Sequence, residues 1–592
     1  MLIRDNLRRD FYDVVRKKHV IIFAANDVDS LCASSILTHL FMCDDVLFSL
    51  LVVGTWSDLE RQLREHSDQD SNIILLNCGG NRSLLDLPVP SNSQVFVLDS
   101  HRPIDIDNAF DDEQIKIVLE GREVDNELKI PAPEDVFEPE SEDENEEEEE
   151  EEGEEGGENR PPRRDRAMQR AQRNIIRKEE KRRWKTKQAE LLWNYYETSW
   201  TSLSTSVLLL SVASELSRAT AELFWLAAVG LSSQFTDGAI SLDAYNETCV
   251  EHMQPYIAKF APRVGEKQAR ADDLLRIKFE RDIPLALYQH WTLWNAMSAD
   301  PFFSCLTRNW MQKGDTEMKH QLRKMELTLA ECRQNFSALP IERKKEVIGT
   351  LLKTMNTELG AFVLHRGFSA RVTAIDVARG LAARLDGRIR DSESGRDSTN
   401  TKESRQDART LLADRFEGAR EMLEGFLKGA AASGPEMERC FGPAKDEIVA
   451  IFEALSSVIN QSEILPNGHF YLYSAKEHLP WGTASLFRFL RFLAAAFSAS
   501  KKGRNTKPLI VCYPHDSADD SGYHLVAGIM PLATVYPDNH IKTFLGRAFE
   551  RATQRSNITA KRDFFDPSVL LVKSEHRSRF LDTLQLMLET VN

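Results

Sequence analysis

Two aspartates stand one residue apart at the end of the first apolar run of the chain, in the stretch HVIIFAANDVDSLCA. Asp27 and Asp29 lie where this run gives way to a predicted helix. Carboxylates in such a pattern can hold a manganese- or magnesium-type ion for phosphoester hydrolysis. The competing interpretation is that an aspartate after a strand is only a helix cap or a turn residue.

Polar side chains follow two more apolar runs in the same way. Asn77 comes after NIILL, and Asp99 and His101 come after VFVL. The carboxyl ends of parallel strands meet at one edge of an open α/β sheet, and ligands bind there. We therefore expect these three side chains to meet the two aspartates in one crevice.

The elements that would position these residues alternate between strand and helix over 19–120. Each strand candidate is a short apolar run without alternation, as expected of a parallel strand that is buried on both faces. Predicted helices separate the runs, so the pattern predicts an open α/β sheet covered on both faces. The predicted strands are 19–25, 46–54, 72–78 and 94–100, with a fifth and more exposed one at 114–120.

Three domains are expected along the 592 residues. Residues 1–235 hold the predicted sheet. The patterns over 236–460 are almost entirely helical, including LLRIKFE and ELGAFV. Strand signals return after Pro466, so 461–592 is predicted to be a smaller α/β domain. The predicted irregular or charged segments are a disordered acidic insert at about 131–160, a basic helix at 161–197 and a mobile loop at about 388–408.

The net charge of −17 comes mainly from one acidic block, 138–158, which holds 15 acidic residues and no basic ones. The rest of the chain is close to neutral, so its charge does not mark it as a nucleic-acid-binding protein. Three interpretations stay open for the basic run at 160–187: a nuclear localisation signal, a DNA or partner contact, and a solvated helix face. The acidic block is either a solvating insert, or a segment that docks a basic partner or imitates phosphate.

Several classes of protein are disfavoured by what the sequence lacks. Its eight cysteines form no CxxC pair, which argues against a zinc site and a disulfide framework. The charged start MLIRDNLRRDF is not a secretory signal. The most apolar stretch, LFRFLRFLAAAF, contains Arg488 and Arg491, so we expect a core helix and no membrane contact. No GxxxxGK[ST] phosphate loop occurs.

The strand-end motifs resemble those of the DHH phosphoesterases, the family that includes the RecJ single-strand exonucleases. Asp27 and Asp29 match the D-x-D motif of that family. The resemblance implies a RecJ/DHH-like parallel-sheet domain, a helical inter-domain insertion and a smaller C-terminal DHHA-type α/β domain.

The chain departs from the DHH pattern at three places. The Asp-Cys-Gly-like turn is Asn77-Cys78-Gly79, the Asp-His-His signature is Asp99-Ser100-His101, and Gln234 replaces the late aspartate. A two-metal site needs several anionic ligands, and a neutral amide does not replace a bridging carboxylate. We therefore expect a vestigial site without catalytic residues, metal or cofactor.

Further segments, in order along the whole chain, resemble the eukaryotic RecJ-like family of cell-division-control protein forty-five, subunits of the CMG replicative helicase. They are DSHRP, the acidic block with the basic RRW helix after it, LYQHW, FLGRAFERA and DPSVLLVKSEHRSRFLDTL. The resemblance implies a nuclear, non-catalytic replication factor. Its implied partners are the MCM helicase ring, the GINS complex, other replication-fork proteins and single-stranded DNA.

Two other functions remain as alternatives. One is an active metal-dependent exonuclease or phosphoesterase that uses Asp27, Asp29, Asp99 and His101. The other is an acidic chaperone-like protein that acts through 138–158. The aromatic residues of LYQHW are either part of a packed core or a patch for a partner.

Overall fold

The computed structural model describes residues 1–67, 70–90, 92–121, 128–137, 163–260, 275–366, 370–386, 401–428, 434–479, 481–500, 507–515, 522–531 and 540–589. It divides into two compact units. The larger one comprises Met1–Glu120 and Ser199–Asn592, and the smaller one is Gly121–Thr198.

The larger unit contains a six-stranded, all-parallel sheet in the order β1-β7-β5-β4-β2-β3. All five strands predicted over 19–120 are present. The fifth, β7, is mostly buried, because the short strand β1 at the N-terminus covers its outer edge; the prediction of an exposed strand is wrong. The strands are β1 Leu2–Ile3, β2 His19–Ala25, β3 Phe48–Val53, β4 Ser71–Leu76, β5 Val95–Leu98 and β7 Ile115–Val118.

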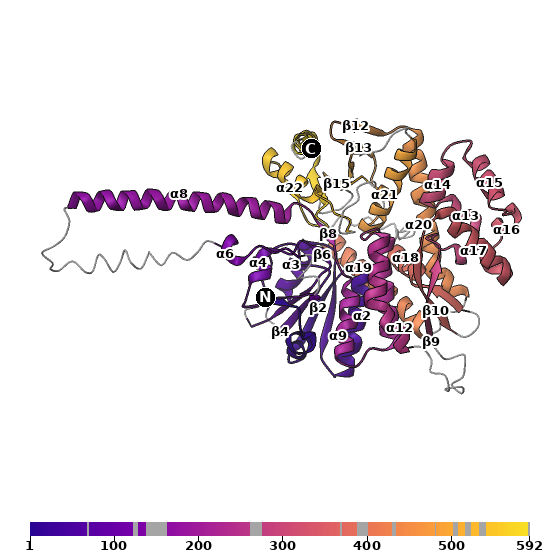
Figure 1. Cartoon of the computed structure of the whole chain (residues 1–592), viewed down its shortest axis with the longest axis horizontal. Helices are drawn as coiled ribbons and strands as arrows, with labels where there is room; N and C mark the ends of the chain where they lie inside the picture. The colour runs from indigo at the N-terminus through magenta and orange to yellow at the C-terminus, as the bar shows by residue number, and fades with distance from the viewer. Residues whose placement is uncertain are drawn as a thin grey trace. The chain divides into compact units, whose positions relative to one another are not determined.

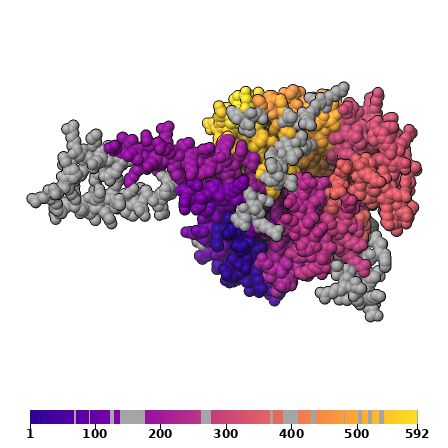
Figure 2. Space-filling view, in the orientation of Figure 1, coloured from indigo at the N-terminus to yellow at the C-terminus, as the bar shows by residue number. Residues whose placement is uncertain are grey.

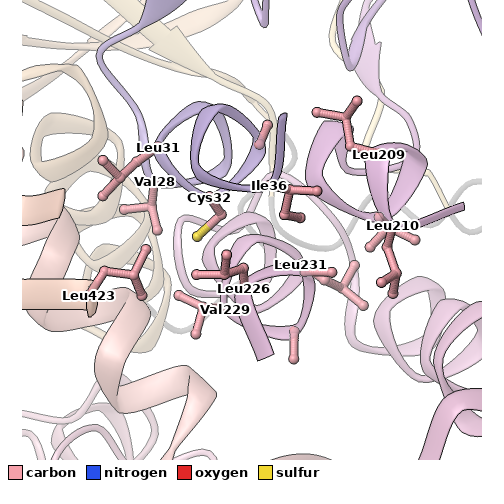
Figure 3. Close-up of a cluster of buried hydrophobic side chains, with 14 of the residues drawn as sticks. Val28, Leu31, Cys32, Ile36, Leu209, Leu210, Leu226, Val229, Leu231 and Leu423 are labelled. Atoms are coloured by element: carbon pink, nitrogen blue, oxygen red, sulfur yellow. The ribbon is translucent and has the colours of Figure 1, made fainter. Parts of the chain in front are cut away.

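Helix α2 (Val28–Cys43) packs on strands β2, β3 and β4 of this sheet (Figure 1), and α9 (Thr205–Glu215) and α10 (Ala221–Thr236) pack against α2 and against each other. Figure 3 shows their apolar side chains directed toward one another, with Leu423 of α19 (Thr401–Lys428) beside them. Helix α2 is apolar on nearly every side, as expected of a helix that is surrounded by protein. This core fixes the first turn of α2, where the two aspartates lie.

The other N-terminal elements are short. They are η1 Leu7–Tyr12, α1 Asp13–Val15, α3 Trp56–Glu65, β6 His101–Arg102, α4 Ile106–Phe110 and β8 Trp200–Thr201.

The region after α10 is mainly helical, but it also contains a three-stranded antiparallel sheet in the order β11-β10-β9. The helices predicted at LLRIKFE and GAFV are therefore wrong, since β9 is Leu275–Asp282 and β10 is Leu359–Arg366. In β9, apolar and charged residues alternate, which is the period of a half-buried antiparallel strand. The remaining elements are α11 Leu242–Thr248, η2 Cys249–Met253, α12 Gln254–Phe260, η3 Tyr288–His290, α13 Leu293–Ser298, α14 Pro301–Thr307, α15 Gly314–Lys324, α16 Leu329–Arg333, η4 Phe336–Ala338, α17 Ile341–Met355, β11 Ala370–Thr373, α18 Ala374–Leu385 and α20 Gly434–Asn460.

The mobile loop predicted at about 388–408 is corrected in its last part, because α19 begins at Thr401. The segment TKESRQDA is rich in residues that favour helices, and this preference outweighs its high polarity. The residues before Thr401 in the predicted loop lie outside the described part of the chain.

The LYQHW segment is packed rather than exposed. Tyr288 is buried and donates a hydrogen bond to Asp282, and the ring of His290 stacks on Phe441 with centroids 4.3 Å apart. Burial lowers the pKa of His290 to about 4, so its imidazole is neutral at pH 7.

The C-terminal region forms a second six-stranded, mixed sheet in the order β12-β13-β14-β15-β17-β16. One apolar cluster lies between it and α21, and another lies between its opposite face and α22 with α23. The predicted return of strands after Pro466 is thus confirmed. The elements are β12 Ile464–Asn467, β13 Phe470–Ser474, α21 Thr483–Ser500, β14 Leu509–Pro514, β15 Tyr523–Ile529, α22 Leu545–Ser556, β16 Ala560–Lys561, β17 Val569–Lys573, η6 Ser574–His576 and α23 Arg577–Glu589.

The two large sheets of this unit are connected by direct contacts. Trp56 packs edge-on against Phe565 at 5.5 Å between ring centroids, and its backbone N–H donates to the carbonyl of Asp563. In the space-filling view the yellow residues at the end of the chain lie beside the orange residues of the same region (Figure 2). The apolar core of the first sheet also continues into α18, α19 and α20, so the boundaries at 235 and 460 stay predictions.

The smaller unit contains α6 (Pro133–Val136) and the 34-residue α8 (Arg163–Tyr196). The predicted basic helix at 161–197 corresponds to α8. Within this unit Lys187 pairs with Asp135 at 2.7 Å. Of the predicted acidic insert at 131–160, only 131–137 falls within the described residues.

Among the described residues, no helix is both long and apolar enough to cross a membrane. The stretch LFRFLRFLAAAF is part of α21, and Arg488 is buried there in the protein core, as predicted.

Candidate functional site

The sheet order brings three strand ends together. Strands β2, β4 and β5 are neighbours in the sheet and end at nearly the same height, where Ala24 pairs with Leu76 and Leu76 pairs with Leu98. Each strand is followed by one of the predicted polar residues. The convergence expected from the strand pattern is therefore present.

Asp27 is the N-cap of α2. Its carboxylate accepts hydrogen bonds from the backbone N–H of Ser30 at 2.7 Å and from the Ser30 hydroxyl at 2.8 Å. Burial and the neighbouring carboxylate of Asp29 raise the pKa of Asp27 to about 7. The competing interpretation, that an aspartate after a strand is a helix cap, thus describes the local geometry of Asp27.

Asp29 lies in the first turn of α2, but its carboxylate caps the N-terminus of a second helix, α9. The hydroxyl of Ser204 donates to its carboxylate at 2.5 Å, and the backbone N–H groups of Thr205 and Ser206, at the start of α9, donate at 2.8 and 3.0 Å. Asp29 is only 3% exposed. The positive end of the α9 dipole and these donors stabilise the carboxylate where a cation would otherwise be needed.

Asn77 lies between the two aspartates. Its amino group donates to Asp27 at 3.3 Å and to Asp29 at 3.1 Å. Its carbonyl oxygen accepts from the backbone of Ser100 at 3.2 Å and from the hydroxyl of Thr205 at 2.6 Å. If the oxygen and nitrogen of the Asn77 amide were exchanged, the oxygen would face the two aspartate carboxylates and could not donate to them. The hydrogen-bond partners therefore fix the orientation of the amide.

Asp99 and His101 form an ion pair beside this centre. The Asp99 carboxylate is 2.7 Å from Nδ1 of His101 and also accepts from the backbone N–H of His101 and Gly80. Burial alone would raise the pKa of Asp99, but the charge and hydrogen bonds of His101 lower it. Burial would lower the pKa of His101, but the charge of Asp99 raises it to about 9.

Gln234 lines the same cavity without joining the carboxylates. Its amino group donates to the carbonyl of Ser202 at 3.3 Å. Its side-chain oxygen is buried without a hydrogen-bond partner among the described residues. Gly230, one turn earlier in α10, is needed because a Cβ there would come within 2.7 Å of an Asp29 oxygen.

The hydrogen-bond donors at the start of α9 were not predicted from the sequence. The signal was the hydroxyl-rich run SLSTS before an apolar stretch, which is typical of a helix N-terminus. The pattern does not reveal that a carboxylate 175 residues away accepts from it.

The residues present do not fit a two-metal centre. Asp29 accepts four hydrogen bonds, and the Asn77 amino group occupies the place between the carboxylates. No group of three or more His, Cys, Asp or Glu in the described part of the chain is arranged to hold a metal ion. Hydrogen bonds from the protein's own donors therefore occupy the carboxylate oxygens that a metal ion would need.

The His101–Asp99 pair predicts a pH dependence of stability. The folded-state pKa of His101, about 9, exceeds the ordinary value of 6.5, so its contribution is complete below pH 6.5 and is lost as pH rises through 9. The raised pKa of Asp27 likewise makes the unfolding free energy fall as the pH rises from about 4 to 7. We expect His101→Gln to remove about 2 kcal/mol of the fall in unfolding free energy between pH 6.5 and 9.

Urea unfolding followed by tryptophan fluorescence at both pH values would measure this difference. His320→Gln, at an exposed position of α15, is the control and should keep the wild-type profile. Equal pH profiles for wild type and His101→Gln would contradict the ion pair.

The centre opens into a cavity of about 1090 Å³ in the larger unit. Its walls come from the carboxyl edge of the first sheet, from α10 and α21, and from the β15 and β17 regions of the second sheet. Asp27, Asn77 and His101 lie at one wall, and Trp481, Gly528 and Asp566 lie at the other. The cleft between the two α/β regions thus remains open, although the carboxylates of Asp27 and Asp29 accept hydrogen bonds from the protein itself.

A family model described as CDC45 matches residues 20–587. The chain belongs to the CDC45 family. It is 30% identical over 599 residues to a protein named cell division control protein 45 homolog from Homo sapiens, covering 99% of each chain. The mouse protein of that name is 29% identical, with 99% of this chain and 100% of the relative covered.

The crystal structure of CDC45 from Entamoeba histolytica has the same fold, with a TM-score of 0.65, 16% sequence identity and full coverage of both chains. The family predicted from the residues and the predicted α/β fold class are therefore confirmed. Membership in the CDC45 family supports a role in DNA replication.

Proposed function

We propose that this CDC45-family chain is a non-catalytic, nuclear subunit of the CMG replicative helicase. In this proposal it joins the MCM ring to the GINS complex and contacts single-stranded DNA and other replication-fork proteins. The observation that carries the non-catalytic part is the Asn77 amino group between Asp27 and Asp29. A centre whose own donors occupy its carboxylate oxygens supports a scaffold better than a metal-dependent hydrolase.

The region between the two α/β parts is our candidate for the partner-binding element. A small phosphoesterase does not need an insertion of this size, and the insertion has an apolar core of its own around Tyr288, Phe303 and Leu351. The part of the region that packs around this separate core, 283–355, can present a fixed surface to a partner without changing the cleft.

Co-purification from nuclear extract tests the proposal. The tagged full chain should retain MCM and GINS subunits, identified by mass spectrometry, after washes that remove an unrelated tagged acidic protein. Recovery of neither complex would contradict the proposal. Deletion of 138–158 alone should leave this recovery intact, whereas loss of function in cells with intact assembly would favour the acidic chaperone-like alternative.

The nuclease alternative is tested with the pure chain, Mn²⁺ and end-labelled single-stranded DNA. We expect no digestion above that of an Asp27→Ala variant. Digestion by the wild type that disappears in Asp27→Ala would establish the exonuclease instead.

A further inference from the structure

Trp200 occupies a fixed position at the cleft. It lies in β8, which pairs with β6 so that Trp200 is opposite Arg102 and Thr201 is opposite His101. The preceding residue, Ser199, exchanges two backbone hydrogen bonds of 2.8 and 2.9 Å with Thr543. The Trp200 backbone is therefore held between a strand of the vestigial centre and the segment that leads into α22.

The ring of Trp200 also carries a cation. The ammonium of Lys542 lies 5.0 Å from the ring centroid, within the range of a cation–π interaction. The indole N–H is buried and has no hydrogen-bond partner among the described residues. Trp200 and Lys542 both line the 1090 Å³ cavity. An aromatic ring and an ammonium are thus presented together at one place in the cleft.

Two acidic groups of the cleft face a buried cation, and a third accepts hydrogen bonds from a serine. Asp237 and Asp386 face the buried guanidinium of Arg488, and Asp566 accepts hydrogen bonds from Ser568. Burial lowers the pKa of Arg491 to about 10, so this arginine keeps its charge at pH 7. The lysine and arginine residues that line the cavity are Arg102, Arg415, Arg491 and Lys542, and the protonated His101 of the Asp99 ion pair lines it as well.

We propose that Trp200 and Lys542 form a contact site for single-stranded DNA in the cleft, where Lys542 binds a backbone phosphate and Trp200 holds that ammonium and contacts a base. The inference deepens the proposed function by naming residues for its DNA contact, and it rests on that function. Single-strand sites combine cationic side chains with aromatic ones, and Lys542 and Trp200 present this combination in the cleft.

The lysine is tested by fluorescence anisotropy of a labelled oligo(dT) bound to the full chain. Lys542→Gln should weaken binding about tenfold, whereas Lys542→Arg should stay close to wild type because it keeps the charge. The slope of log affinity against log salt concentration should become shallower by about 0.7 in Lys542→Gln, as expected for one lost single-strand phosphate contact. A purely structural role of Lys542 would not change that slope.

Lys561→Gln is the matched control for the lysine. Lys561 also lies over an aromatic ring, 4.9 Å from the centroid of Tyr523, but it does not line the cavity. Equal weakening by the two glutamine variants would show nonspecific electrostatics and overturn the proposal.

The tryptophan is tested in the same assay. Trp200→Leu should weaken binding about tenfold, in the range measured for aromatic contacts to single strands. Trp294→Leu is its control, because Trp294 also carries a cation, Arg333 at 5.7 Å, away from the cleft. Competition by thymidine monophosphate as strong as that by oligo(dT) would assign the cleft to a free nucleotide and overturn the proposal.

The outcomes separate this inference from the proposed function. If wild type binds oligo(dT) and the Trp200 and Lys542 variants bind equally well, the inference fails while the proposed DNA contact stands. If wild type recovers MCM and GINS but binds no oligo(dT), the inference and the DNA contact fail while the bridging role stands.

Discussion

Replacing Arg488 with methionine is expected to lower the unfolding free energy of the chain by about 3–5 kcal/mol, since breaking a buried ion pair leaves uncompensated charge. Only 4% of the Arg488 side chain is exposed. Its guanidinium pairs with Asp237 after α10, lies 2.9 Å from Glu447 in α20, and lies 3.9 Å from Asp386 after α18. The substitution therefore removes the guanidinium that contacts all three carboxylates, and leaves only the longer-range charge of Arg379 and Arg491 near them.

The same network connects α21 of the C-terminal region to three helices outside it. Asp386 also accepts hydrogen bonds from the backbone N–H and the hydroxyl of Ser485, in the first turn of α21, at 2.7 and 2.9 Å. A residue distant in the chain thus caps the helix that carries Arg488. Because α10 and α21 both form walls of the cleft, the network fixes the distance between those walls.

Thermal melting and limited proteolysis would measure the effect of Arg488→Met. Arg420→Met is the control, because Arg420 pairs with Glu417 and Glu424 on the surface of α19 and such pairs contribute about 0–1 kcal/mol. Adding Glu447→Gln to Arg488→Met should recover part of the loss, since it removes one unpaired carboxylate. If Arg488→Met melts like Arg420→Met, the buried network does not stabilise the fold.

The positions of the site residues could be predicted because they depend on local pattern. Asp27, Asn77 and Asp99 each follow an uninterrupted apolar run, and parallel strands place such residues at one edge. The hydrogen-bond partners could not be predicted in this way. The donors of Asp29 come from α9, beyond the whole acidic and basic segment, and nothing local distinguishes Asp29 from Asp27 as their acceptor.

The errors in the fold have a similar cause. Leu275, Ile277 and Phe279 alternate with charged residues, which is the period of a strand, and only Leu275 and Phe279, four residues apart, would also share one face of a helix. The strand forms because β10, some eighty residues later, pairs with it along its full length. Long-range pairing decided the structure there, whereas residues 401–408 became helical through local propensity.

Replacing Asn77 with aspartate is expected to destabilise the metal-free chain by about 2–4 kcal/mol, the range for a buried charge left without a partner. The substitution removes the two N–H donations to Asp27 and Asp29 and puts a third carboxylate between them. It also restores an anionic ligand where the chain departs from the DHH pattern. We therefore expect Mn²⁺ to raise the melting temperature of Asn77→Asp by several degrees and that of the wild type by less.

Two controls separate restored metal binding from simple loss of hydrogen bonds. Asn77→Ala loses the same donors without gaining charge, so it should melt early and not respond to Mn²⁺. Asn108→Asp is the matched change elsewhere, because buried Asn108 donates to the carbonyls of Gly79 and Arg82 and does not contact the aspartate centre. A Mn²⁺ response of Asn108→Asp equal to that of Asn77→Asp would show that any buried aspartate suffices. A wild-type response as large as that of Asn77→Asp would show that the amide at position 77 does not prevent metal binding, and the non-catalytic assignment would then lose its physical basis.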